Sequence, residues 1–184
     1  IEVGERSLGQ ARFARAVGAV RDAVDGLGLD DDDRVTQFEV LTAAAFVAFA
    51  EAEVDAVVIE AGLGGRYDAT NVMDPDAVVI LTNVALEHTE LLGTTETQIA
   101  AEKLAVAPDG SDRLIIGRLS PRAEAAVAAE CRARGLSGWQ VGRDIHVADV
   151  AGGVDVVTPR AGYAALPLRL HGAFQRDNLA VAVA

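Results

Sequence analysis

The sequence of 184 residues is poor in cysteine, aromatic residues and basic residues. Cys131 is the only cysteine, which excludes an internal disulfide and favours a reduced, cytoplasmic setting. Aromatic residues make up only 4% of the chain and hydrophobic residues 51%, so we expect a core of Ala, Val and Leu. No apolar run reaches the roughly 18 residues that a membrane-spanning helix requires, so we expect no membrane partner.

Basic residues are also scarce: 16 Lys and Arg stand against 28 Asp and Glu, which gives a net charge of −12. Nucleic-acid binding requires a basic face that neutralises phosphates, so we exclude a nucleic-acid partner. The four aspartates at 30–33 are typical of a solvated loop. Neither a Walker phosphate loop nor the dinucleotide pattern Gly-x-Gly-x-x-Gly occurs in the chain.

The pattern of apolar residues predicts an α/β fold, with a doubly wound, mostly parallel sheet and helices on both faces. Continuous β-branched runs indicate buried strands, which we place at 56–59, 77–81 and 114–116. Apolar residues at helical spacing, with their start and stop signals, predict helices at 7–28, 38–53, 95–107, 121–135 and 175–184. The first of these begins with a capping-box pattern at Ser7, and the second is apolar nearly all round, which predicts burial. Short strands at 145–150, 154–158 and 164–170 predict a small antiparallel addition at one edge of the sheet.

A carboxylate and a glycine-rich turn come directly after the first predicted strand. Glu60 follows the apolar run, and the turn at 62–65 follows Glu60. Strand ends of parallel sheets are where α/β proteins bind ligands. The glycines either approach a phosphate closely or form a tight turn. A buried Glu60 requires a partner, because burying an unpaired charge costs free energy. A metal cation is one such partner, and Arg66 is the structural alternative.

Polar residues also follow the second predicted strand, in the segment 82–93. His88 in this segment fits a surface histidine when taken alone. Beside Glu60 it becomes a candidate metal ligand, because two strand ends converge on one crevice. A histidine together with a carboxylate suggests a Mg²⁺ site that also accepts Mn²⁺. Lys103, on the next helix, has three open roles: a phosphate contact, a solvated position, or a carbamate formed with CO₂.

Five segments resemble, in order, the central ATPase domain of the folylpolyglutamate synthase/dihydrofolate synthase family, which belongs to the Mur ligase superfamily. They are residues 36–42, 60–72, 86–93, 99–103 and 171–178. The resemblance implies an ATP-dependent ligase. ATP phosphorylates a carboxylate of dihydropteroate or a reduced folate, and the amine of glutamate then attacks the acyl phosphate.

The resemblance also implies a role for each site residue. Glu60 and His88 correspond to family ligands of Mg²⁺, and Lys103 to a catalytic lysine that is carbamylated in the family. Asn178 and Gln175 correspond to residues near the nucleotide. The chain departs from the family pattern at Glu87, where Asp is usual, at 104–106, where Ala-Gly-Ile is usual, and at Phe174.

We expect residues 1–184 to form one incomplete central domain of a longer, monomeric enzyme. The family's phosphate loop would lie upstream of this chain and its C-terminal domain downstream. The chain alone is then expected to be inert, because a triphosphate without its backbone cradle binds poorly. Two alternatives stay open: a non-catalytic nucleotide- or metal-binding remnant, and a Mur-type ligase that acts on a different carboxylate.

Overall fold

The computed structural model describes residues 1–30, 33–72 and 76–184. Two of the four aspartates at 30–33 therefore lie outside the described residues. The chain divides into two compact units. The first consists of residues 1–63 and 67–72, and the second of residues 64–66 and the chain after residue 72. No helix among the described residues has both the length and the hydrophobicity to cross a membrane.

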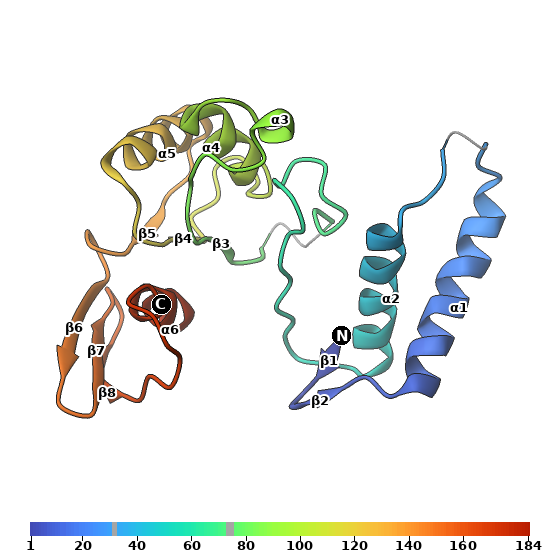
Figure 1. Ribbon diagram of the computed structural model, residues 1–184, viewed down its shortest axis with the longest axis horizontal. Coiled ribbons are helices and arrows are strands. Elements are labelled where there is room, and N and C mark those ends of the chain that lie inside the picture. The colour runs from blue at the N-terminus through green and yellow to red at the C-terminus, as the bar shows by residue number, and fades with distance from the viewer. Residues whose placement is uncertain (31–32, 73–75) are drawn as a thin grey trace. The chain divides into compact units, whose positions relative to one another are not determined.

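The first unit is a pair of helices beside a short hairpin (Figure 1). Strands β1 (Glu2–Val3) and β2 (Arg6–Ser7) pair antiparallel. Helices α1 (Gln10–Leu27) and α2 (Gln37–Glu51) pack against each other through a small core of alanine and valine. Helix α1 ends as expected at Gly28, which adopts the left-handed conformation with φ 62°.

Two expectations for these helices were wrong. The capping box lies at the start of α2 and not at Ser7: the Thr36 hydroxyl accepts from the Glu39 N–H, and the Thr36 N–H donates to the Glu39 carboxylate. Helix α2 is also not buried all round: its side that meets α1 is covered, but the residues at 37–39 in its first turn are exposed. Phe38 on this helix is 43% exposed.

The strand expected at 56–59 does not form. These residues have no regular secondary structure, none of the described residues pairs with them in a ladder, and Val58 is 95% exposed. The β-branched run is what a buried strand requires, yet a strand is stable only with a hydrogen-bonded neighbour. Composition therefore indicates the tendency to form a strand, but it does not indicate whether a partner strand is present.

The second unit is built on a parallel sheet with the strand order β3-β4-β5. The strands are β3 (Val79–Leu81), β4 (Leu114–Ile116) and β5 (Gly138–Gln140). Helices α4 (Glu96–Leu104) and α5 (Pro121–Arg134) cover one face, over a core that includes Leu114 and Ile116. The short helix α3 (Thr89–Leu92) lies between β3 and α4 in the chain.

The opposite face of this sheet is covered by α6 (Gln175–Val183) and a second, antiparallel sheet (Figure 1). That sheet consists of β6 (His146–Val150), β7 (Gly153–Val157) and β8 (Gly162–Leu166). Ile115 from β4 packs with both elements. The α/β class with helices on both faces is therefore confirmed. The antiparallel strands form a sheet of their own and do not extend an edge of the parallel one.

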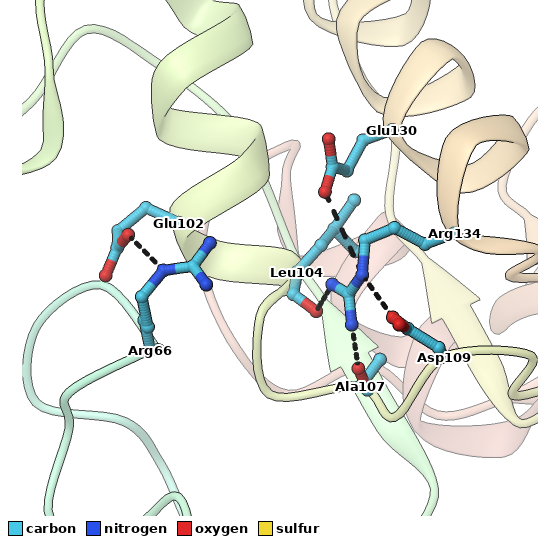
Figure 2. A network of polar contacts seen from close by, with 7 residues as sticks. All are labelled: Arg66, Glu102, Leu104, Ala107, Asp109, Glu130 and Arg134. Atoms are coloured by element: carbon cyan, nitrogen blue, oxygen red, sulfur yellow. Dashed lines mark hydrogen bonds and ion pairs between the residues drawn. The ribbon is translucent and has the colours of Figure 1, made fainter.

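An arginine joins the ends of α4 and α5 (Figure 2). Arg134, in the last turn of α5, donates to the carbonyl of Leu104 at 2.8 Å and to the carbonyl of Ala107. Its Nε lies 2.7 Å from the Asp109 carboxylate. Carbonyls in the last turn of a helix have no partner within the helix, so Arg134 supplies one. This contact holds the end of α4, which carries Lys103.

Candidate functional site

The carboxyl ends of the parallel strands bring several polar residues to one edge of the second unit. Gly117, directly after β4, packs so closely on the segment after β3 that a Cβ there would lie 2.2 Å from the Thr82 carbonyl oxygen. Arg118 follows and reaches Asp177 on α6, with Nε 3.0 Å from the carboxylate. The segment after β3, the segment after β4 and the first turn of α6 therefore meet at this edge.

Lys103 joins this edge through an ion pair. Its Nζ lies 2.7 Å from Oε1 of Glu87, which follows β3 in the chain. The hydrogen bond and the positive charge of Lys103 lower the pKa of the Glu87 carboxyl, with a smaller contribution from His88. The glutamate that departs from the family pattern is thus the residue that holds the lysine in this structure.

His88 begins helix α3 in an unusual backbone conformation. Its φ is 47° and its ψ 40°, in the left-handed region that residues other than glycine seldom adopt. Its carbonyl accepts from the N–H groups of Leu91 and Leu92, which holds the turn in place. Glu53 and Ala165 share a positive φ, so this conformation alone does not distinguish His88, and its role as a metal ligand stays a prediction.

Glu60 lies in the first unit and is exposed. The expectation that it is a buried carboxylate was wrong, because the strand that would have buried it does not form. Arg66, the structural partner considered for it, forms an ion pair with Glu102 at 3.2 Å (Figure 2). No group of three or more His, Cys, Asp or Glu side chains that could hold a metal occurs in the described part of the chain. A joint site of Glu60 and His88, which belong to different units, stays a prediction.

The glycines at 62–65 are required by packing. A Cβ at Gly62 would lie 2.6 Å from the Phe38 ring within the first unit. A Cβ at Gly65 would lie 2.8 Å from the carbonyl oxygens of both Glu102 and Lys103 on α4, within the second unit. Gly64 adopts φ 68°. This run therefore allows close contact with protein neighbours, including the helix that carries Lys103.

Asp68 organises the same run and was missed by sequence reasoning. Its carboxylate accepts from the N–H groups of Gly62 and Leu63, both at 2.9 Å, and from the N–H and hydroxyl of Thr70 at 3.0 and 2.6 Å. Burial raises the pKa of Asp68, but the hydrogen bonds outweigh it, so the pKa is lowered overall. An aspartate that bonds the backbone two residues ahead is a known turn signal, which was present in the sequence.

Gln175 and Asn178 share the first turn of α6. The Asn178 Nδ2 donates to the Gln175 Oε1 at 3.0 Å. The structure thus brings together the two residues predicted to contact the nucleotide, and Asp177 between them links their turn to Arg118. The nucleotide contact itself stays a prediction.

Comparison with known proteins identifies relatives over most of the chain. No protein-family model matches it. Folylpolyglutamate synthase of Lacticaseibacillus casei is 38% identical over 148 residues, which is 80% of this chain and 34% of that protein. Dihydrofolate synthase/folylpolyglutamate synthase of Mycobacterium tuberculosis is 38% identical over 168 residues, which is 82% of this chain and 33% of that protein.

Solved structures agree with this result. The apo form of L. casei FPGS matches with a TM-score of 0.84 at 35% identity, over 97% of this chain and 44% of that chain. An FPGS–AMPPCP–folate complex matches with a TM-score of 0.80 at 37% identity, over 92% of this chain and 42% of that chain. The chain spans about a third of the length of the curated relatives it matches. The family resemblance that the five segments predicted is confirmed.

Proposed function

We propose, from its homology to the folylpolyglutamate synthase/dihydrofolate synthase family over most of its length, that this chain is the central domain of an ATP-dependent ligase. The reaction joins glutamate to dihydropteroate or to a reduced folate. The observation that carries the proposal is the edge of the second unit where β3 and β4 end. Glu87, after β3, pairs with Lys103, and Arg118, after β4, pairs with Asp177 in the turn that holds Gln175 and Asn178. A similar solved structure holds AMPPCP and folate, which supports ATP and a folate as substrates.

The residues at this edge have different roles in the proposed reaction. Gln175 and Asn178 contact the nucleotide, and Lys103 acts beside the phosphate that is transferred, either as a cation or as a carbamate. A phosphoryl group passes to the substrate carboxylate, and the glutamate amine then displaces phosphate to form the amide. Positioning and electrostatic stabilisation supply most of the catalysis in such transfers.

In this proposal Glu60 and His88 would be the protein ligands of Mg²⁺, since a carboxylate and an imidazole are both donors for divalent cations. This ion keeps several waters and binds through one or two protein groups together with substrate phosphates, so a cluster of three side chains is not needed. When bound, it would shield the charge of the phosphates. Mn²⁺ is expected to replace it, because one ligand is an imidazole.

The test uses the complete open reading frame that contains this chain. We expect release of ADP that depends on glutamate and on either dihydropteroate or a reduced folate. We expect His88→Ala to reduce kcat at least a hundredfold. His146→Ala is the matched control, because His146 is an exposed histidine on β6 and is expected to leave turnover unchanged.

Three results would count against the proposal. Nucleotide binding without turnover would indicate a non-catalytic remnant, and turnover with another carboxylate only would indicate a different Mur-type ligase. Equal activity of the His88→Ala and His146→Ala variants would remove His88 from the site. The 184-residue chain alone is expected to release no ADP, since it contains no Walker phosphate loop. We also propose that the intact enzyme is cytoplasmic and monomeric, and sedimentation of the purified protein tests the second point.

A further inference from the structure

The first turn of α6 is held from two sides of the second unit. Arg176 forms an ion pair with Asp149 on β6, in the antiparallel sheet. Asp177, the next residue, accepts both contacts from Arg118 Nε, at 3.2 Å to Oδ1 and 3.0 Å to Oδ2. Arg118 comes two residues after the end of β4, in the parallel sheet. Adjacent residues on one helical turn thus join it to both sheets.

Arg118 also lies beside a glycine that follows β5. Gly142, just after β5, adopts φ 96°, and a Cβ at this position would lie 2.9 Å from the Arg118 Nη1. The positive φ favours glycine at this position, and the Arg118 guanidinium lies directly beside it. The Arg118 side chain is 53% exposed and that of Asp177 26%. A pair this exposed contributes little to stability, so its effect is expected in the orientation of the turn.

We propose that Arg118 is a positioning residue for the nucleotide contacts of Gln175 and Asn178. These two side chains lie on either side of Asp177 in the sequence and bond each other at 3.0 Å. An anchor at Asp177 therefore fixes the orientation of both amides relative to the edge where β3 and β4 end. The inference rests on the proposed function, because it assigns Arg118 to the ATP side of the same site. Small displacements of positioning groups cost catalysis far more than they cost folding.

The test measures KM for ATP and for the pterin substrate separately in the complete enzyme. Arg118→Ala and Asp177→Ala are each expected to raise KM for ATP roughly tenfold and to leave KM for the pterin within about twofold. The exchanged pair, Arg118→Asp with Asp177→Arg, is expected to restore KM for ATP to within about threefold of the parent. Arg122→Ala is the control, because Arg122 is 86% exposed and lies 3.8 Å from Glu96.

Each outcome decides between positioning and another role. A raised KM for ATP in Arg118→Ala without the same change in Asp177→Ala would mean that Arg118 touches the nucleotide itself, and would overturn the proposal. Failure of the exchanged pair to restore KM would also overturn it, as would a control variant that behaves like Arg118→Ala.

A second measurement separates this proposal from the proposed function. If the parent protein shows no turnover, the proposed function fails, and amide hydrogen exchange at 175–180 then tests the anchor by itself. Exchange in this turn is expected to become several-fold faster in Arg118→Ala and to return toward the parent rate in the exchanged pair. Unchanged exchange in Arg118→Ala would overturn the positioning role.

Discussion

Replacing Asp68 with asparagine tests whether one carboxylate holds the glycine run in place. Asp68 accepts four hydrogen bonds, two through each oxygen: Oδ2 from Gly62 and Leu63, and Oδ1 from Thr70 twice. Asparagine keeps one acceptor oxygen and places an NH₂ group against the other pair of donors. Hydrogen bonds to a charged acceptor contribute about 1.5–3 kcal/mol each.

Two of the four bonds lose their acceptor, and the lower end of that range gives about 3 kcal/mol for the two. Because the Asp68 side chain is only half-buried, water replaces part of this, and we expect a loss of about 2 kcal/mol in local stability. Amide hydrogen exchange on a peptide that covers residues 60–72 measures it. A loss of about 2 kcal/mol corresponds to roughly 30-fold faster exchange. Asp22→Asn is the control, because Asp22 forms an exposed ion pair with Arg21 at 2.9 Å. Equal exchange in the two variants would refute the reasoning.

The pH dependence of this effect has a defined sign. The pKa of Asp68 is lowered in the folded chain, so its contribution is complete above the unfolded value of about 3.9 and is lost as the pH falls through the folded pKa. The difference between parent and Asp68→Asn is therefore expected to be constant above about pH 5 and to shrink below about pH 4. A difference that grows on acidification would contradict the assignment.

Three further predictions concern the stability of the two units. Gly65→Ala is expected to cost about 1–3 kcal/mol in urea unfolding, since its Cβ would meet two α4 carbonyls. Gly18→Ala, in α1 with open space around it, is its control and is expected to add about 0.5–1 kcal/mol. Arg134→Ala is expected to cost about 2–3 kcal/mol by thermal unfolding, and Arg134→Lys to recover only part of this because lysine does not form the same fork. Thr36→Ala is expected to cost about 1 kcal/mol by removing the cap of α2, measured by far-UV circular dichroism.

Those parts of the fold that depend on local signals were predictable. The helix ends at Gly28 and Gly135, both left-handed, were predicted from capping residues. For α4 the sequence offered Thr94 or Thr95 as N-cap, and the structure has Thr95. Strands β3 and β4 were predicted from their β-branched runs. Elements that depend on neighbours were not. Strand β5 contains glycine, tryptophan and glutamine and carries no such run, yet it pairs with β4 in register.

The candidate site shows the same division. His88, Lys103, Gln175 and Asn178 were named from motifs, and the structure adds their partners. The pairing of Lys103 with Glu87 across 2.7 Å joins residues sixteen apart in the sequence, one on α4 and one in the segment between β3 and α3. Nothing in the spacing signals that contact, because it depends on how α4 packs on the sheet. Glu60 shows the converse case, in which a strong local pattern predicted burial that the structure does not contain.

The glycine run acts on the candidate site through packing. Gly65 lies against the carbonyl oxygens of Glu102 and Lys103, and Arg66 pairs with the Glu102 side chain. A larger residue at Gly65 would push this segment away from α4 and disturb the ion pair as well. Two contacts thus fix the position of Lys103: the glycine backbone at its carbonyl and Glu87 at its Nζ. The backbone of Lys103 contacts the Gly65 segment, and its side chain contacts Glu87. A change at Gly65 is therefore expected to move the Lys103 ammonium group without removing any group that takes part in chemistry.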